Sequence, residues 1–181
     1  MIICVLGPQG SGKSTQAQLL AQKLNIPHLD TGKLLRAYAQ KPTPLGQQLH
    51  HYISVGILVP DNIYFPVLEE EIAKPEYQNG FVIDGTPRVL NQAINLPFQV
   101  DKVIFVDVSD EVGTERLLKR VKIEHREDDT PETIRRRLGL FHQATEPVLD
   151  YYCKQNKLIE INGERPIEVI FADICQKLNL K

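Results

Sequence analysis

The sequence has no tryptophan, no long hydrophobic run and no large excess of either charge. No apolar stretch approaches the roughly 20 residues of a membrane span, and residues 1–6 are too short for a signal-peptide core. We therefore expect a soluble protein of the cytoplasm. Lysine and arginine number 21 against 23 aspartates and glutamates, a net charge of −2. A general nucleic-acid binder is disfavoured, because it needs a basic surface.

Cysteine is also scarce. Cys4, Cys153 and Cys175 lie far apart, with no Cys-x-x-Cys pair. That spacing predicts neither a disulfide framework nor a structural zinc site. The length of 181 residues and the 42% share of hydrophobic residues instead predict one compact domain. No long heptad or obvious interface strand appears in the sequence, so we expect a monomer.

Short apolar runs alternate with segments of helical spacing. The runs lie at residues 2–6, 81–83, 103–106 and 158–161, and the helical segments at 15–24, 110–120, 131–152 and 166–178. Such runs, rich in β-branched residues, are typical of strands buried on both faces. The alternation predicts an α/β fold, with a parallel sheet between two layers of helices and ligands beyond the carboxyl ends of the strands.

Two stretches interrupt this alternation. Residues 31–59 have helical character but are broken by Pro42 and Pro44, which predicts a small helical insertion. Residues 121–129 are mostly charged and lie between two helical segments, which predicts a short exposed flap. The core of the single domain would then comprise residues 1–30, 60–120 and 130–181.

A glycine-rich loop follows the first predicted strand. Residues 7–14 read GPQGSGKS, which fits the phosphate-binding pattern GxxxxGK[ST] and opens a predicted helix. Glycines let backbone N–H groups turn toward phosphate oxygens, Lys13 adds a positive charge, and Ser14 is placed to ligate Mg²⁺. Asp84 follows the run at 81–83, where a carboxylate can hold a Mg²⁺ water or the Ser14 hydroxyl.

Arginines gather around the charged flap. Those in the flap and its flanking helices are Arg116, Arg120, Arg126, Arg135, Arg136 and Arg137, whereas Arg36 and Arg88 stand apart. Arginine suits bidentate recognition of phosphate, and phosphoryl transfer mainly requires positioning and charge neutralisation. Pairing with acidic neighbours on a solvated helix face explains one or two of the three at 135–137.

Five motifs occur in order: GKSTQ at 12–16, TGKLLR at 31–36, GILVPD at 56–61, DGTPR at 84–88 with Gln92-Ala93, and REDD at 126–129 with Arg137-Leu138. Together they resemble the nucleoside monophosphate kinases, and within them the adenylate kinase family, over nearly the whole chain. The resemblance implies a P-loop kinase fold with a parallel sheet of about five strands. Residues 31–59 would be the NMP-binding insertion and 121–129 a lid of the short form, without structural zinc.

The resemblance also implies roles for individual residues. The ATP side would comprise Gly10, Ser11, Gly12, Lys13, Ser14, Thr15, Arg116 and Arg120. The AMP side would comprise Thr31, Arg36, Val59, Gly85, Arg88, Gln92, Arg126 and Arg137, with the Gln92 amide on the adenine edge. The catalytic set would be Lys13, Arg88, Arg120, Arg126 and Arg137. Mg²⁺ would be held by Ser14 and Asp84, in part through water.

The implied reaction is MgATP + AMP ⇌ 2 ADP, which balances the adenine nucleotides. Two alternatives stay open. The first alternative is a kinase for CMP, UMP or a similar monophosphate. Pyrimidine-specific relatives carry an Asn after the Pro-Arg pair, and this chain has Asn91 there. The other is a non-catalytic adenine-nucleotide sensor, because Lys33 and Thr86 replace an acidic residue and a phenylalanine of the usual pattern.

Overall fold

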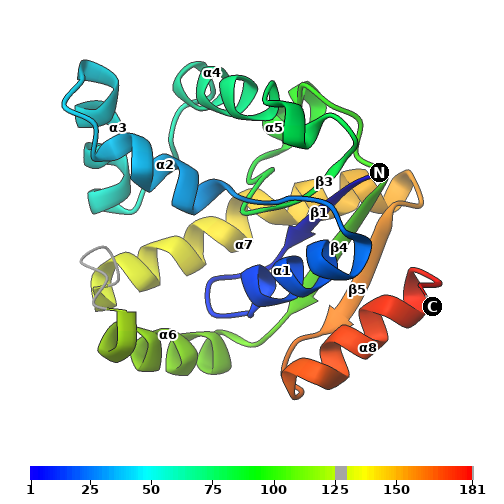
Figure 1. Ribbon diagram of the computed structural model, residues 1–181. Coiled ribbons are helices and arrows are strands. Elements are labelled where there is room, and N and C mark those ends of the chain that lie inside the picture. Colours follow the sequence, from blue (N-terminus) through cyan, green and yellow to red (C-terminus); the bar gives the residue numbers. More distant parts are fainter. Residues whose placement is uncertain (125–129, 181) are drawn as a thin grey trace.

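A computed structural model describes residues 1–124 and 130–180, with the backbone alone described at 120–124. Five parallel strands form one sheet in the order β2-β3-β1-β4-β5 (Figure 1). They are β1 (Ile2–Leu6), β2 (His28–Asp30), β3 (Phe81–Asp84), β4 (Lys102–Asp107) and β5 (Leu158–Asn162). The α/β fold with about five parallel strands is therefore confirmed.

Eight α-helices and one 3-10 turn are found in the described ranges. They are α1 (Lys13–Leu24), α2 (Thr31–Ala39), α3 (Pro44–Val55), α4 (Asp61–Ile72), η1 (Pro75–Tyr77), α5 (Leu90–Asn95), α6 (Asp110–Glu124), α7 (Pro131–Lys154) and α8 (Ile167–Lys177). Of the helices described, none is both long enough and apolar enough to cross a membrane.

The sheet is buried on both faces, as its apolar strands predict. Successive side chains of a strand point to opposite faces. Ile3 and Val5 of β1 belong to a core with residues of α1 and α8. Cys4 and Leu6 belong to a second core with residues of α4 and α7. The two helix layers hold the strands so that their carboxyl ends share one edge.

Among the differences between the predicted and the observed elements, three bear on the site or the flap. The strand β2 was not predicted, because its three residues include no β-branched side chain. Helix α1 begins at Lys13, inside the phosphate loop, rather than at residue 15. Helix α6 continues to Glu124 instead of ending at residue 120, so the predicted flap begins as helical backbone. The rest of that flap, residues 125–129, lies outside the described residues.

The stretch predicted to be a helical insertion, residues 31–59, contains α2 and α3, with no strand between them in this fully described stretch. The two helices pack against each other at one side of the molecule (Figure 1). Pro44, which breaks the helical pattern in the sequence, is the first residue of α3, and the Thr43 side chain caps it by accepting from the Gly46 N–H at 3.0 Å. Both residues are typical of a helix start.

Candidate active site

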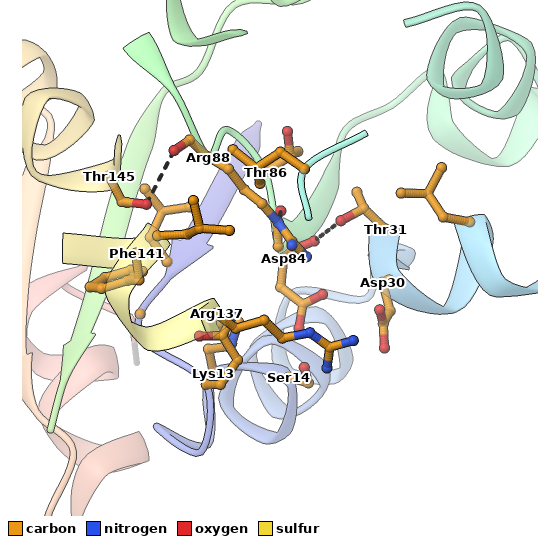
Figure 2. Close-up of a pocket in the computed structure, with 18 of the residues that line it drawn as sticks. Lys13, Ser14, Asp30, Thr31, Asp84, Thr86, Arg88, Arg137, Phe141 and Thr145 are labelled. Carbon is orange, nitrogen blue, oxygen red and sulfur yellow. Dashed lines mark hydrogen bonds between the residues drawn. The ribbon is translucent and has the colours of Figure 1, made fainter. Parts of the chain in front are cut away.

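A cavity of about 420 Å³ opens at the carboxyl ends of β1, β2 and β3. Its walls come from the phosphate loop, the insertion, the loop after β3, and helices α6 and α7 (Figure 2). This is where an open parallel sheet binds its ligands, and the volume lies in the range of small-molecule sites.

Most of the predicted site residues line this one cavity. They are Gly10, Gly12, Lys13, Ser14, Thr15, Thr31, Arg36, Val59, Asp84, Gly85, Arg88, Gln92, Arg116 and Arg137. Ser11 is absent from the described lining. Its side chain is buried, and its Oγ accepts from the Lys13 backbone N–H at 3.4 Å. The side chain of Arg120 and the whole of Arg126 lie outside the described residues.

The phosphate loop turns on glycines in the left-handed region. Gly10 and Gly12 both have φ of 83°. A Cβ on Gly10 would lie 2.2 Å from the carbonyl oxygen of Gly113 in α6, so the loop and that helix are in direct contact. The first turn of α1, which begins at Lys13, has no acidic residue, so the N-terminal end of this helix favours an anion. Lys13 Nζ donates to the Pro8 carbonyl oxygen at 3.2 Å.

Asp84 ends β3 beside both neighbouring strands. Its register partners are Val5 of β1 and Asp30 of β2, so the carboxylates of Asp30 and Asp84 leave the sheet at the same edge. The Asp84 side chain is buried, and its Oδ2 has no hydrogen-bond partner among the described residues, with His28 Nε2 3.8 Å away. Ser14 lines the same cavity (Figure 2). A carboxylate and a hydroxyl are oxygen donors of the kind Mg²⁺ prefers, so these residues fit that ion.

Three arginines, Arg36, Arg88 and Arg137, bring positive charge to the lining of the same cavity. Arg88 is fixed by two bonds: its Nε donates to the Gly85 carbonyl oxygen at 2.7 Å, and its own carbonyl oxygen accepts from Thr145 Oγ1 at 3.1 Å. Burial lowers the pKa of the Arg88 guanidinium, and the nearby charges of Arg137 and Arg36 lower it further. Like charges gathered this closely favour an anion between them.

Gly85 allows the loop after β3 to lie close to Thr31 at the start of α2. Its φ is 79°, and a Cβ there would lie 2.6 Å from Thr31 Oγ1. The Thr31 hydroxyl donates to the Asp84 carbonyl oxygen at 2.8 Å, which ties the start of α2 to the end of β3. Any side chain at residue 85 would separate the two elements.

Gln92 lines the cavity and is 4% exposed. Its Oε1 accepts from the Arg88 backbone N–H, and its Nε2 donates to Asp61 Oδ1, both at 2.9 Å. Asn91 is exposed, donates to the other Asp61 oxygen, and is absent from the described lining of the cavity. The sequence analysis missed the role of Asp61, although the residue closes the GILVPD motif.

Two buried hydroxyls lie close to Arg88. Tyr64 from α4 and Thr86 after β3 are 4% and 1% exposed, and neither hydroxyl has a well-aligned hydrogen-bond partner in the described part of the chain. Burial raises the pKa of Tyr64, and the nearby Thr86 hydroxyl and Arg88 charge offset part of that rise. Thr86 takes the position of the phenylalanine in the usual motif, and its hydroxyl lies near that of Tyr64.

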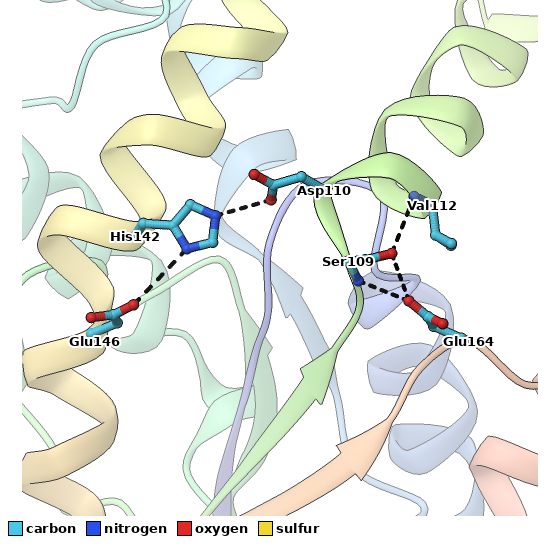
Figure 3. Close-up of polar contacts among 6 residues, drawn as sticks. All are labelled: Ser109, Asp110, Val112, His142, Glu146 and Glu164. Atoms are coloured by element: carbon cyan, nitrogen blue, oxygen red, sulfur yellow. Dashed lines mark hydrogen bonds and ion pairs between the residues drawn. The ribbon is translucent and has the colours of Figure 1, made fainter.

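Arg116 connects α6 to the phosphate loop and to the loop after β5. Its Nη1 donates to the Gly163 carbonyl oxygen at 2.9 Å and lies 3.5 Å from that of Gly10. The N-terminal end of α6 is held by the same loop, because Ser109 donates to Glu164 Oε1 from both its backbone and its hydroxyl (Figure 3). These bonds lower the pKa of the Glu164 carboxyl.

Helix α7 holds α6 from the other side. His142 Nε2 lies 2.9 Å from Asp110 Oδ1, and His142 Nδ1 lies 4.0 Å from Glu146 on its own helix (Figure 3). The three side chains are about half exposed or more, so each contact contributes little to stability. They bring Asp110, the first residue of α6, next to α7.

The arrangement can hold two anions in one cavity, one on the phosphate loop and one among the arginines. A site of this kind defines a P-loop phosphotransferase.

A family model described as adenylate kinase matches residues 5–157. The chain is 41% identical to an adenylate kinase of Cyanothece sp., over 95% of this chain and 92% of that one. It is 38% identical to an adenylate kinase of Xanthomonas campestris pv. campestris, over 98% and 99%, and 34% identical to one of Methanothrix thermoacetophila, over 99% of each. The chain belongs to the adenylate kinase family.

Proposed function

We propose that this chain catalyses the reversible reaction MgATP + AMP ⇌ 2 ADP and so balances the adenine nucleotides. The AMP phosphate attacks the γ-phosphoryl group in line, and no covalent enzyme intermediate forms. One observation carries the proposal: Arg36, Arg88 and Arg137 line the same cavity as the phosphate loop. The obstacle to the reaction is the repulsion between two anions, and fixed positive charges offset it.

The donor side is the phosphate loop and α6. The backbone N–H groups from Gly10 to Thr15 and the Lys13 ammonium hold the ATP phosphates, with Ser11 supporting the loop from below. Arg116 lies against the donor base, where its bond to Gly163 fixes it. Arg120 and Arg126, outside the described side chains, complete the charge around the transferred group.

The acceptor side is the insertion and the loop after β3. Arg36 and Arg88 hold the AMP phosphate, and Arg137 lies between it and the γ-phosphoryl group. Thr31, the backbone around Val59, and Gln92 face the base, and Gly85 also belongs to the AMP side. Support comes from the cavity, which all of these residues line.

Ser14 and Asp84 are the residues that hold Mg²⁺, Asp84 through water. Bound there, the ion would neutralise part of the phosphate charge. The buried Asp84 Oδ2, which has no hydrogen-bond partner in the described part of the chain, supports this assignment, because such an atom is unfavourable unless a ligand or water meets it.

We also propose that residues 31–59 and 121–129 act as an insertion and a lid that exclude water, since water in the closed site would hydrolyse ATP. The lid of adenylate kinase is a known example of such gating. The remainder, residues 1–30, 60–120 and 130–181, is the core. The protein acts as a monomer in the cytoplasm, and its free cysteines, among them the exposed Cys153, suit that reducing compartment.

The test is to incubate the purified protein with MgATP and, separately, AMP, GMP, CMP, UMP and dTMP, and to resolve the nucleotides by ion-exchange chromatography. We expect two ADP for each AMP consumed. Product from another acceptor alone would move the activity to a sister kinase. ATP binding without product from any acceptor would support a nucleotide sensor.

A further inference from the structure

The side-chain amide of Gln92 is held at both ends. Its Oε1 faces the Arg88 backbone N–H and its Nε2 faces Asp61 Oδ1, each at 2.9 Å. A backbone N–H can only donate and a carboxylate can only accept, so these neighbours identify which end of the amide is oxygen and which is nitrogen. Turning the amide by half a revolution would set N–H against N–H and oxygen against oxygen. The amide therefore has one favoured orientation.

Asp61 is held in place as well. It is the first residue of α4, where the N-terminal end of the helix favours a negative charge. Its Oδ1 faces Gln92, and its Oδ2 accepts from the Asn91 side chain. Each carboxylate oxygen of Asp61 thus accepts from a different side-chain amide. The bond from exposed Asn91 to Oδ2 keeps Oδ1 directed toward Gln92.

The oriented amide still offers one acceptor and one donor side by side. Oε1 has two lone pairs and Nε2 has two hydrogens, and the bonds within the described residues use one of each. Gln92 lines the cavity, so the remaining pair is available to a ligand. Adenine presents a 6-amino donor beside a ring-nitrogen acceptor, which matches this pair. A 6-oxo purine has an oxygen in place of the amino group, and that oxygen would meet the Oε1 lone pair.

We propose that Asp61 is a positioning residue that sets the choice of acceptor: by fixing the Gln92 amide, it makes the site accept a 6-amino purine monophosphate and reject a 6-oxo purine monophosphate. This inference rests on the proposed function, because it assumes a nucleotide in the acceptor half of the cavity. Without the Asp61 charge, the amide can turn at lower cost and present its donor to the 6-oxo group.

The experiment compares AMP with IMP as acceptors for the wild-type protein and for Asp61→Asn. Asparagine keeps the size of the side chain but can meet either end of the Gln92 amide. We expect the ratio of kcat/KM for AMP to that for IMP to fall roughly tenfold or more, the range of one base-specific contact. Glu69→Gln removes one exposed charge from the same helix and is the matched control, with an unchanged ratio expected. Asp61→Ser is the second variant if Asp61→Asn does not fold.

A double-mutant cycle separates positioning from a merely structural role. In the Gln92→Leu background, Asp61→Asn should leave the AMP to IMP ratio unchanged, since there is no amide left to orient. A ratio within twofold of wild type in Asp61→Asn, or the same loss of ratio in both backgrounds, would overturn the inference while AMP turnover by the wild type kept the proposed function intact. Failure of the wild type to use any acceptor would instead overturn the proposed function.

Discussion

Arg136 Nη1 donates a hydrogen bond to the carbonyl oxygen of Val55 at 2.8 Å, which joins helix α7 to the C-terminal end of α3. The next residue, Arg137, lies 3.4 Å from the carbonyl oxygen of Ile53 through its Nη2. Carbonyl groups in the last turn of a helix lack partners within the helix and carry partial negative charge, so they attract cations. The C-terminal end of α3 is therefore in contact with two neighbouring arginines of α7.

This contact predicts that Arg136→Met weakens AMP use selectively. Removing an exposed cation at a helix C-terminus costs about 0.3–1 kcal/mol. The loss lowers the fraction of the protein in which α3 is held against α7, and the apparent affinity for AMP falls in proportion to that fraction. We therefore expect the KM for AMP to rise about two- to fivefold and the KM for ATP to stay within twofold. Initial rates at varied AMP and ATP measure both. Arg135→Met, exposed on the same turn, is the control. Equal effects on both substrates would contradict the assignment.

Lys13→Ala should remove activity and keep the fold. Lys13 lines the cavity and serves the phosphates rather than either hydrophobic core, so we expect turnover to fall by at least about 100-fold, the usual effect of losing one charge-stabilising donor. The thermal midpoint should stay within a few degrees of wild type. Lys23→Ala, in the last turn of the same helix, should retain full activity. Near-normal turnover in Lys13→Ala would contradict the role of the phosphate loop.

Gln92→Ala should impair AMP use more than ATP binding. The amide contacts Arg88 and Asp61 on the acceptor side, and the loss of a base-specific contact lowers kcat/KM for AMP by about 5- to 150-fold. The Kd for ATP, measured by calorimetry without acceptor, should change less than twofold. Asn95→Ala, on the exposed side of the same helix, is the control. If ATP binding alone weakened, the acceptor half of the cavity would be wrongly placed.

Tyr64→Phe should not destabilise the protein. The Tyr64 hydroxyl is buried without an aligned partner among the described residues, and removing a buried polar group that makes no hydrogen bond is neutral or stabilising by up to about 1 kcal/mol. Urea denaturation monitored by circular dichroism gives the free energy of unfolding. Tyr152→Phe, at another buried tyrosine, allows comparison. A loss of more than about 1 kcal/mol would show that the Tyr64 hydroxyl has a hydrogen-bonding partner, such as an ordered water.

The strands that carry the site were readable from the sequence because each is a short apolar run buried on both faces. β1 and β3 matched their predicted runs to within a residue, and these two strands deliver the phosphate loop and Asp84 to one edge. β2 escaped prediction, since His28-Leu29-Asp30 becomes a strand only by pairing with β3. Local sequence lacks the information that tertiary pairing supplies.

The set of cavity residues was likewise predictable, but the bonds among them were not. A motif shows that Gln92 and Asp61 occur in the chain, yet the two are brought together only when α5 and the start of α4 meet. The bond from Arg136 to Val55 depends in the same way on the packing of α7 against the insertion. Sequence spacing predicts which face of a helix a residue occupies, whereas these contacts depend on the distance between elements.

The close contact between Gly10 and Gly113 restricts which residues either position of this chain can hold. A Cβ on Gly113 would lie 2.8 Å from the Gln9 carbonyl oxygen, just as one on Gly10 would strike Gly113. Gly113 lies in a helix, where an alanine would ordinarily be welcome. In a saturation mutagenesis experiment, both positions should nevertheless reject every other amino acid. Gly113, a residue type that forms helices poorly, would thus be one of the least replaceable residues of α6.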